Sequence, residues 1–348
     1  MPYRRTGWTI LLAVAVALAG RPPTVAAARP DRVTARTERA IEDGLAFLAR
    51  TQARNGAWRS RTRYGVYPCA ITSLAGLALM AGGNTPSEGP YADNVRRAVD
   101  FILKCANRNG LIAVMGEEQR PMYGHGFGML FLAQAYGAEQ DAELQRDLYR
   151  VLSRAVMLTA RSQSPDGGWL YTPDAGSDEG SVTVTQIQAL RACRNAGIKV
   201  PKATIERAVD YVARCANDDG GISYSLRNLG RSRPAITAAA VAVLYNAGKY
   251  DSPIALRALD YVRQHIEGGG TGSFRGHRCY ALLYAAQAMY LSSDANWQWF
   301  VSKYRDELLD QQHDDGSWPG DNVGEVYGTA MTLLVLELPY RYLPILQR

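Results

Sequence analysis

Acid–base side chains stand just ahead of several apolar segments of the chain. His125 lies in a Gly-His-Gly context, and Glu179 and Glu325 each precede a segment rich in small apolar residues. An imidazole can exchange protons at neutral pH because its ordinary pKa is near 6.5. We therefore take His125 as the candidate general acid or base, with Glu179 or Glu325 as its catalytic partner. A packing or capping role for His125 at a crowded helix start is the alternative.

Polar and aromatic side chains occupy the equivalent places elsewhere in the chain. Tyrosine offers an apolar face and a polar tip, which suits sugars, lipids or cations, and arginine favours anions. The candidate ligand-binding residues are Tyr67, Tyr123, Gln186, Arg231, Arg233, His277, Arg278, Tyr280, Tyr284 and Tyr327. Core packing of the tyrosines and salt bridging between loops are the competing explanations.

Metal and cofactor chemistry is not indicated by the spacing of ligand-type residues. His277 and Cys279 are close in sequence, but no further ligands accompany them to complete a tetrahedral set. We predict no metal site and no cofactor. The five cysteines are expected to be buried free thiols.

A repeated unit must position these side chains. Three segments share the pattern Q-x-x-(N/D)-G-x-W, at Gln52–Trp58, Gln163–Trp169 and Gln312–Trp318. Weaker copies fill the gaps, so that turn glycines recur at Gly56, Gly110, Gly167, Gly220, Gly272 and Gly316. A period of about 50 residues is typical of helical repeat architectures. The chain therefore consists of six related units.

Each unit predicts a helix, a glycine turn, a loop and a second helix. Upstream of the turns, apolar residues recur with helical spacing on one face, as in the stretch 97–101. Downstream, the segments are apolar nearly all round and must be buried; they cover 71–81, 127–136, 185–196, 236–247, 279–291 and 329–338. We expect an all-α, closed double ring in one domain at 29–348, with units at 36–83, 92–137, 147–197, 203–248, 254–291 and 299–340. The second helices begin at one rim of that ring, the mouth, where their N-termini should favour anions.

The first 28 residues have the pattern of an export signal. Arg4 and Arg5 precede the apolar stretch 8–20, and small residues follow at 26–28. Thirteen apolar residues are too few to span a bilayer, so a secretory signal peptide at 1–28 fits better than a membrane anchor. Its removal would lower the net charge from +6 to +3, which gives no reason to expect nucleic-acid binding. We expect a periplasmic, cell-surface or secreted protein.

The Gln-x5-Trp segments resemble the repeats of terpenoid cyclases and protein prenyltransferase β-subunits. This superfamily builds α/α toroids, and the resemblance extends over the whole chain after residue 28. It implies that the repeated Gln and Trp hold neighbouring helices together. The chain is also similar to secreted bacterial prenyltransferase/squalene oxidase repeat proteins, whose name carries no reaction.

The chemistry of the best-known members is not implied by the residues present. Squalene–hopene-type cyclases protonate their substrate with a D-x-D-D-T motif, whereas the matching segment 181–186 reads SVTVTQ. The prenyltransferase zinc ligands match only at His277, because the preceding inner helix supplies neither the Asp nor the Cys. Both reactions are therefore unexpected.

Three functions remain open at the level of sequence. The first is a central cavity that holds an isoprenoid, another lipid or an elongated glycan, with acid–base chemistry near His125. The second is a non-catalytic scaffold that binds an envelope protein or polymer, or touches a membrane surface through the apolar and basic residues at 340–348. The third is a polysaccharide-degrading toroid. A pocket shared by His125, Glu179, Arg278 and Tyr327 would favour an enzyme, and a cavity filled by the protein's own side chains would favour a scaffold.

Overall fold

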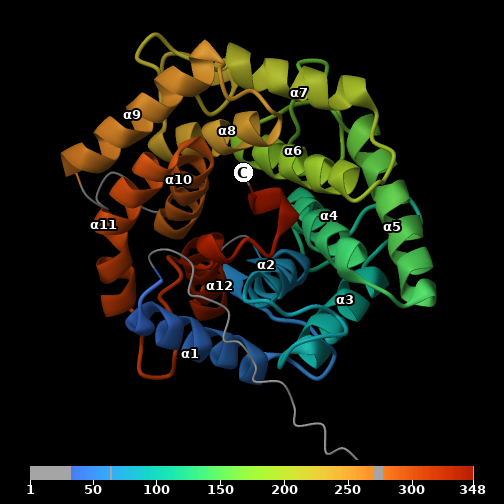
Figure 1. Ribbon diagram of the computed structural model, residues 1–348. Helices are drawn as coiled ribbons and strands as arrows, with labels where there is room; N and C mark the ends of the chain where they lie inside the picture. The colour runs from blue at the N-terminus through green and yellow to red at the C-terminus, as the bar shows by residue number, and fades with distance from the viewer. Residues whose placement is uncertain (1–32, 63–64, 270–276, 348) are drawn as a thin grey trace, which may run out of the picture.

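Twelve α-helices form two concentric rings in the part of the chain that the computed structural model describes, residues 33–62, 65–269 and 277–347 (Figure 1). The expected signal at 1–28 and the turn at Gly272 lie outside these residues. The inner ring consists of α2 (Pro68–Ala81), α4 (Pro121–Ala138), α6 (Gly180–Asn195), α8 (Pro234–Asn246), α10 (Arg278–Ser292) and α12 (Glu325–Leu336). The outer ring consists of α1 (Ala35–Thr51), α3 (Ala92–Lys104), α5 (Ala142–Arg161), α7 (Lys202–Arg214), α9 (Pro253–Gly269) and α11 (Asp294–Asp310).

Burial separates the two rings as their sequences predict. Every residue of α2 is buried, whereas α3 buries one face, from Val95 to Ile102, against the inner ring. An apolar surface on all sides requires neighbours on all sides, and a single apolar stripe suits an outer layer. The all-α toroid predicted from the sequence is confirmed.

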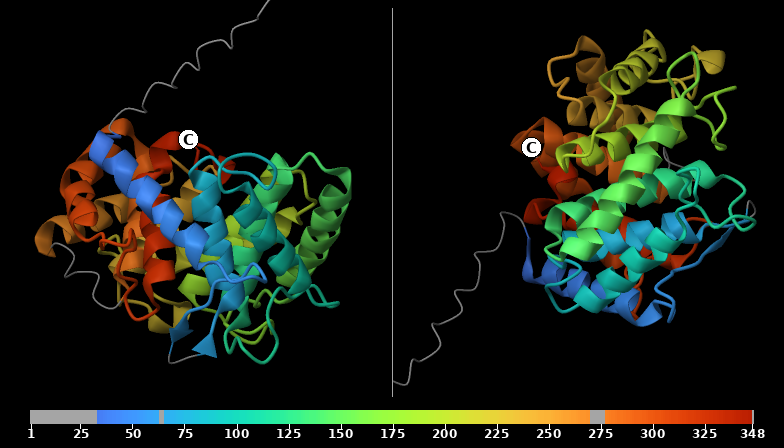
Figure 2. Two further views of the ribbon diagram at one scale, coloured as in Figure 1. Left: turned by 90° about the horizontal axis from the view of Figure 1, so that it is seen from below. Right: turned by 90° about the vertical axis from the view of Figure 1, so that its right-hand side faces the viewer.

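Short elements mark the two ends of the toroid. Strands β1 (Arg61–Thr62) and β2 (Gly65–Val66) pair in the loop before α2. The 3-10 turns η3 (Leu338–Tyr340) and η4 (Pro344–Leu346) follow α12. In the side view of Figure 2 the strand pair lies at one end and the C-terminal segment at the other. The mouth, where the inner helices begin, therefore faces away from the C-terminal segment.

In the three full copies of the motif, the Gln and Trp side chains form hydrogen bonds that hold the turn against the adjacent outer helices. Trp169 lies fully buried, and its indole N–H donates to the Thr159 carbonyl at 2.8 Å. The Gln163 carboxamide donates to the Gly167 carbonyl of its own turn and to the Thr204 carbonyl of the next outer helix. Gly167 has φ 101°, and a Cβ there would lie 2.4 Å from a backbone carbonyl of α7. The turn thus needs glycine for both its conformation and its close approach.

The same contacts close the ring between its last and first units. The Gln312 carboxamide donates to the Ala40 carbonyl of α1 at 2.9 Å, and Gly316 packs against the Asp43 carbonyl. Inner helix α12 also packs against α2 and α1. These contacts join the two ends of the chain directly, so the closed arrangement predicted over an open solenoid is confirmed.

The inner helices begin earlier than the apolar pattern alone predicts. Helix α4 starts at Pro121 rather than Phe127, and α6 starts at Gly180 rather than Thr185. Proline takes the first turn of α2, α4 and α8, where its fixed φ suits a helix start and its missing N–H costs nothing. Tyr123 and Ser181 consequently lie in first turns rather than in loops.

Candidate functional site

Hydroxyl groups and one carboxylate meet at the mouth where α4 and α6 begin. The Tyr123 hydroxyl of α4 lies 2.6 Å from Ser181 Oγ of α6. Ser181 Oγ lies 2.8 and 3.0 Å from the two oxygens of Glu179, which is 3% exposed. The Glu179 carboxylate also accepts the N–H groups of Ser181 and Val182 and so caps α6. These contacts form a continuous chain of hydrogen bonds from Tyr123 to Glu179.

Two loop tyrosines extend this cluster toward α8. The hydroxyls of Tyr171 and Tyr224 lie 2.7 Å apart, and the Tyr224 hydroxyl lies 3.5 Å from Ser181 Oγ. Arg120 lies over the Tyr171 ring at 4.2 Å, and Arg233 lies over the Tyr224 ring at 4.5 Å. Both separations are within the range of a cation–π interaction. We call Tyr123, Tyr171, Tyr224, Ser181 and Glu179 the tyrosine cluster.

Three further tyrosines line the axis of the toroid beside this cluster. Burial raises the pKa of Tyr280 and Tyr327 well above the ordinary value, so both stay protonated. The Tyr280 hydroxyl is buried and has no hydrogen-bond partner in the described part of the chain. The Tyr284 hydroxyl donates to Gln188 at 3.1 Å, and its ring lies 4.6 Å from that of Tyr280. A buried hydroxyl without a partner is costly, which makes Tyr280 a place for a ligand or water oxygen.

Glu179 is held in an environment that favours its protonated form. Burial raises its pKa, and the hydrogen bonds from Tyr224, Ser181 and the helix N-terminus oppose that shift only in part. A protonated carboxyl can donate a proton as well as accept a hydrogen bond. Of the three predicted catalytic residues, only Glu179 lies in this cluster.

A second carboxyl at the mouth was not anticipated. Glu118 Oε1 accepts the Cys69 N–H at the start of α2, while its Oε2 is buried without a partner among the described residues. Burial raises its pKa to about 7. Its loop carries no motif that would distinguish it from the half-buried Glu117 beside it, so sequence alone had no signal for it.

Carboxylate side chains of the protein itself cap several helix N-termini at the mouth, so fewer of these N-termini can attract a bound anion than the sequence predicts. Glu118 caps α2, Glu179 caps α6, and the Asp321 carboxylate accepts the Arg278 and Cys279 N–H groups of α10. Each internal carboxylate offsets the positive end of the helix dipole. The starts of α4, α8 and α12 have no side-chain cap, but Glu325 in the first turn of α12 disfavours an anion there. The starts of α4 and α8 are therefore the ones left to attract anions.

His125 does not lie at the mouth, contrary to the prediction. It is fully buried between α4 and α5, where its Nδ1 accepts the Ile112 N–H at 3.2 Å and its Nε2 lies 2.9 Å from Thr159 Oγ. In four other units a threonine hydroxyl accepts the corresponding N–H, at Thr72, Thr183, Thr237 and Thr329. Burial lowers the pKa of His125 to about 3. His125 is thus one member of a repeated structural contact, and we do not retain it as an acid or base.

The other predicted residues divide between the axis and the outside. Tyr67 is buried at the start of α2, and Gln186 is buried and donates to the Met122 carbonyl at 2.8 Å. Arg278 pairs with Glu307 of the outer helix α11 at 3.0 Å. The residues left exposed at the rim are Glu325, Arg231, Arg233 and His277. His125, Glu179, Arg278 and Tyr327 therefore share no single pocket.

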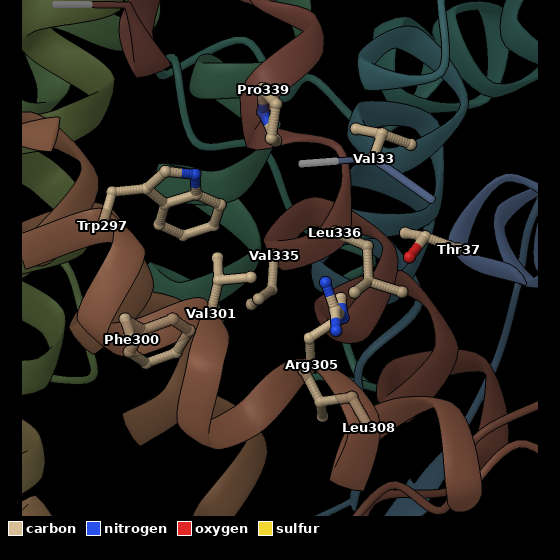
Figure 3. Close-up of a pocket in the computed structure, with 10 residues that line it drawn as sticks. All are labelled: Val33, Thr37, Trp297, Phe300, Val301, Arg305, Leu308, Val335, Leu336 and Pro339. Atoms are coloured by element: carbon tan, nitrogen blue, oxygen red, sulfur yellow. The ribbon is translucent and has the colours of Figure 1, made fainter. Parts of the chain in front are cut away.

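The bore beneath the mouth is nearly full. A space of about 20 Å³ remains at its C-terminal end, enclosed by side chains of α2, α4, α6, α10 and α12 and by Leu343, Ile345 and Leu346 of the C-terminal segment. Ligand sites usually offer hundreds of Å³. A second apolar crevice of about 20 Å³ lies between α1 and α11, beside Trp297, Phe300 and Leu336 (Figure 3). Neither space holds a ligand larger than water in the state described.

The described residues contain neither a group of side chains that could hold a metal ion nor a helix that could span a membrane. No group of three or more His, Cys, Asp or Glu side chains could hold a metal ion there. All five cysteines are buried and free. None of the helices in the described ranges is both long and apolar enough to cross a membrane.

Comparison with known proteins identifies the fold. Residues 138–281 match the family model of the squalene-hopene cyclase C-terminal domain. No curated protein sequence matches the chain. Similar solved structures include a protein from Actinoplanes, at 16% identity and TM-score 0.60 over 88% of this chain and 99% of that one.

Two chemistries are represented among the similar structures. A type II terpene cyclase from Scytonema has 16% identity and TM-score 0.57, covering 88% of this chain and 99% of its own. A glycosidase variant in complex with glucose has 14% identity and TM-score 0.63, covering 86% and 96%. Identities this low establish the fold and leave the reaction open. The chain therefore has the α/α-toroid fold that these terpene cyclase and glycosidase structures share.

Proposed function

We propose that the protein is a glycan-binding toroid whose ligand docks on the tyrosine cluster at the mouth. The observation that carries this proposal is the convergence of tyrosine hydroxyls on Ser181 and Glu179 at the mouth, above inner helices that leave a space of only about 20 Å³ beside the C-terminal segment. Aromatic rings provide faces for sugar rings, and the hydroxyls match the many donors and acceptors of a polyhydroxylated ligand. A hydrocarbon at the same place would cover these hydroxyls and offer them no polar contact beyond those that they already make with one another.

Binding without cleavage fits the carboxylates of the mouth. Glycosidases commonly use a pair of carboxyl groups on either side of the scissile bond. In the described part of the mouth, Glu179 alone is bonded into the tyrosine cluster, while Glu118 and Asp321 are engaged at other helix starts. The glycosidase among the similar structures supports a sugar ligand for this fold without supplying the second carboxylate.

Acid-initiated chemistry on an isoprenoid is the second candidate. It is favoured by the raised pKa of Glu179 beside aromatic rings, and by the terpene cyclase among the similar structures. Its weakness is the bore, which lacks room for such a chain in this state.

Export to the periplasm, cell surface or medium, with an envelope polymer as the ligand, remains part of the proposal and rests on the pattern of residues 1–28. N-terminal sequencing of the protein recovered from its native host tests that point.

Calorimetric titration with cellohexaose, chitohexaose and maltohexaose tests the glycan proposal. We expect one of these to bind the wild type and to bind Tyr224→Ala about two- to tenfold more weakly, since one aromatic contact contributes about 0.5–1.5 kcal/mol. Tyr149→Ala is the matched control, because Tyr149 is 49% exposed on the outer helix α5. Binding unaffected by Tyr224→Ala, or no binding of any of these glycans, would contradict the proposal.

A further inference from the structure

The loop that leads into α8 carries positive charge without any acidic residue of its own. This loop, residues 222–233, contains three arginines with exposed side chains: Arg227, Arg231 and Arg233. We call residues 222–233 the arginine loop. None of its guanidinium groups forms an ion pair or a hydrogen bond with another residue in the described part of the chain. The loop before α2 differs, because its Arg59 pairs with Glu117 at 3.5 Å.

Hydrogen bonds fix the base of the arginine loop. Ser223 and Ser232 form an antiparallel bridge between its two ends. Gly230, at φ 81°, donates its N–H to Asn217 Oδ1 at 2.8 Å. The Ser232 hydroxyl donates to Asp219 at 2.7 Å, so this nearby carboxylate is engaged at the base of the loop rather than with an arginine. The loop is therefore held in one shape before a ligand arrives, which lowers the entropy lost on binding.

The arginine loop joins the tyrosine cluster through Arg233. Its guanidinium carbon lies 4.5 Å from the centre of the Tyr224 ring, and the Tyr224 hydroxyl lies 2.7 Å from that of Tyr171. A guanidinium above an aromatic face keeps N–H donors available for an anionic oxygen. Helix α8 begins directly after Arg233 without a side-chain cap, and its positive end adds to the attraction of anions. A ligand that covers the Tyr224 ring therefore comes against positive charge.

We propose that the glycan bound at the tyrosine cluster is acidic, and that its carboxylate or sulfate groups bind the arginine loop. This inference rests on the proposed glycan-binding function and narrows its ligand to an acidic polysaccharide. The sugar rings cover Tyr171 and Tyr224, and the acidic groups accept hydrogen bonds from the arginines, whose planar fork of donors matches paired anionic oxygens. A neutral glycan would leave three like charges on one short loop without a counter-charge.

Calorimetric titration with matched charged and uncharged ligands tests the role of the acidic groups. Hexagalacturonate and its methyl ester share the same sugar rings and differ in charge, and a κ-carrageenan hexasaccharide and its desulfated form make the same comparison for sulfate. We expect the charged member of one pair to bind at least about fivefold more tightly than its neutral form, and to lose this advantage when NaCl is raised from about 50 to 500 mM. Equal affinity within both pairs, or no binding of either charged ligand, would overturn the proposal.

A double variant assigns the effect to the loop. R227Q/R231Q removes two exposed charges and keeps Arg233 above Tyr224, so it should weaken binding of the charged ligand about three- to thirtyfold and leave binding of the neutral form unchanged. R146Q/R154Q is the matched control, because it removes two exposed arginine charges from the outer helix α5. Circular dichroism establishes that both variants keep their helices. An equal loss of affinity in the two variants would show that only net charge matters and would overturn the proposal.

The outcomes separate this inference from the function on which it rests. Neutral hexasaccharides that bind through Tyr224, without any preference for acidic ligands, would retain the glycan-binding function and remove the arginine loop from it. Acidic ligands that respond to R227Q/R231Q but not to Tyr224→Ala would contradict docking on the tyrosine cluster. Binding to phosphatidylglycerol vesicles that is lost in R227Q/R231Q, with oligosaccharide binding unchanged, would assign the loop to a membrane surface and overturn the proposal.

Discussion

Replacement of His125 tests whether this residue has a structural or a catalytic role. It is the only histidine that is fully buried in the described part of the chain. The imidazole accepts the Ile112 N–H through Nδ1, so its neutral form carries hydrogen on Nε2, facing Thr159. His125→Ala removes both contacts and leaves a cavity between α4 and α5. At about 1 kcal/mol for each hydrogen bond and about 2 kcal/mol for the cavity, we expect a loss of about 4 kcal/mol in the free energy of unfolding. His125→Thr keeps an acceptor hydroxyl of the kind used in the other units and should lose less.

The pH dependence of stability gives the sharper comparison. The pKa of His125 is about 3 in the folded protein and near 6.5 when unfolded, so the unfolded chain binds a proton first as the pH falls. Its contribution to stability is therefore present above about pH 6.5 and is lost progressively toward pH 3. Between pH 7 and about pH 4 the wild type should lose about 3 kcal/mol that His125→Thr does not lose.

Urea unfolding at these two pH values, followed by circular dichroism, measures the effect. The difference in the free energy of unfolding between wild type and His125→Thr should favour the wild type more at pH 7 than at pH 4. Parallel pH dependence of the two proteins would refute the structural assignment. Loss of ligand binding in a stably folded His125→Thr variant would also refute it.

Two further substitutions test a buried carboxyl and the ring closure. Glu337, just after α12, is 2% exposed, and neither of its side-chain oxygens has a hydrogen-bond partner among the described residues. Glu337→Gln should raise the free energy of unfolding at pH 8 and raise it much less near pH 5. Burial raises the pKa of Glu337, so the wild type loses stability as the pH rises above the ordinary pKa of a carboxyl group. Thermal unfolding at both pH values checks this, and an equal stabilisation at both would contradict it. Gln312→Ala should lower the free energy of unfolding by about 1–2 kcal/mol and accelerate amide exchange in α1, because it removes the hydrogen bond to Ala40. Gln163→Ala should accelerate exchange in α7 instead. Faster exchange in the same helix in both variants would exclude a specific role for Gln312 in closing the ring.

The fold was predictable because its signals recur. A single Gln-x5-Trp segment could arise by chance, but six spaced turn glycines and paired helical patterns agree on one unit. The five described turn glycines all have positive φ, between 83° and 101°. The last unit also carried evidence for closure, since an outward-facing end would not need the full set of Gln312, Gly316 and Trp318. These residues meet α1 in the structure.

The candidate site was predictable only where position in the unit decides the direction of a side chain. Tyr123, Glu179 and Tyr280 were predicted from their place at helix starts, and they lie at the starts of α4, α6 and α10. His125 shares that place in sequence, but lies two residues after Tyr123 on a helix, which turns it toward the outer ring. The early start of α4 at Pro121 fixes this difference, and the apolar pattern that begins at Phe127 does not reveal it. Tyr171 and Tyr224 were missed because loop residues carry no periodicity.

The C-terminal segment shows how one stretch of sequence can suit two different surroundings. The residues after 340 combine arginines with Leu343, Pro344 and Ile345, a mixture that suits a membrane surface as well as a protein interior. The structure directs Leu343 and Ile345 into the bore, so in this state they are not available to a membrane. A three-residue turn such as η4 is too short to show a helical or strand pattern in the sequence. Only the residues that it packs against show whether it lies in the protein interior or faces a membrane. The ring of inner helices therefore determines where this segment lies, and the segment in turn determines how much of the bore a ligand can reach.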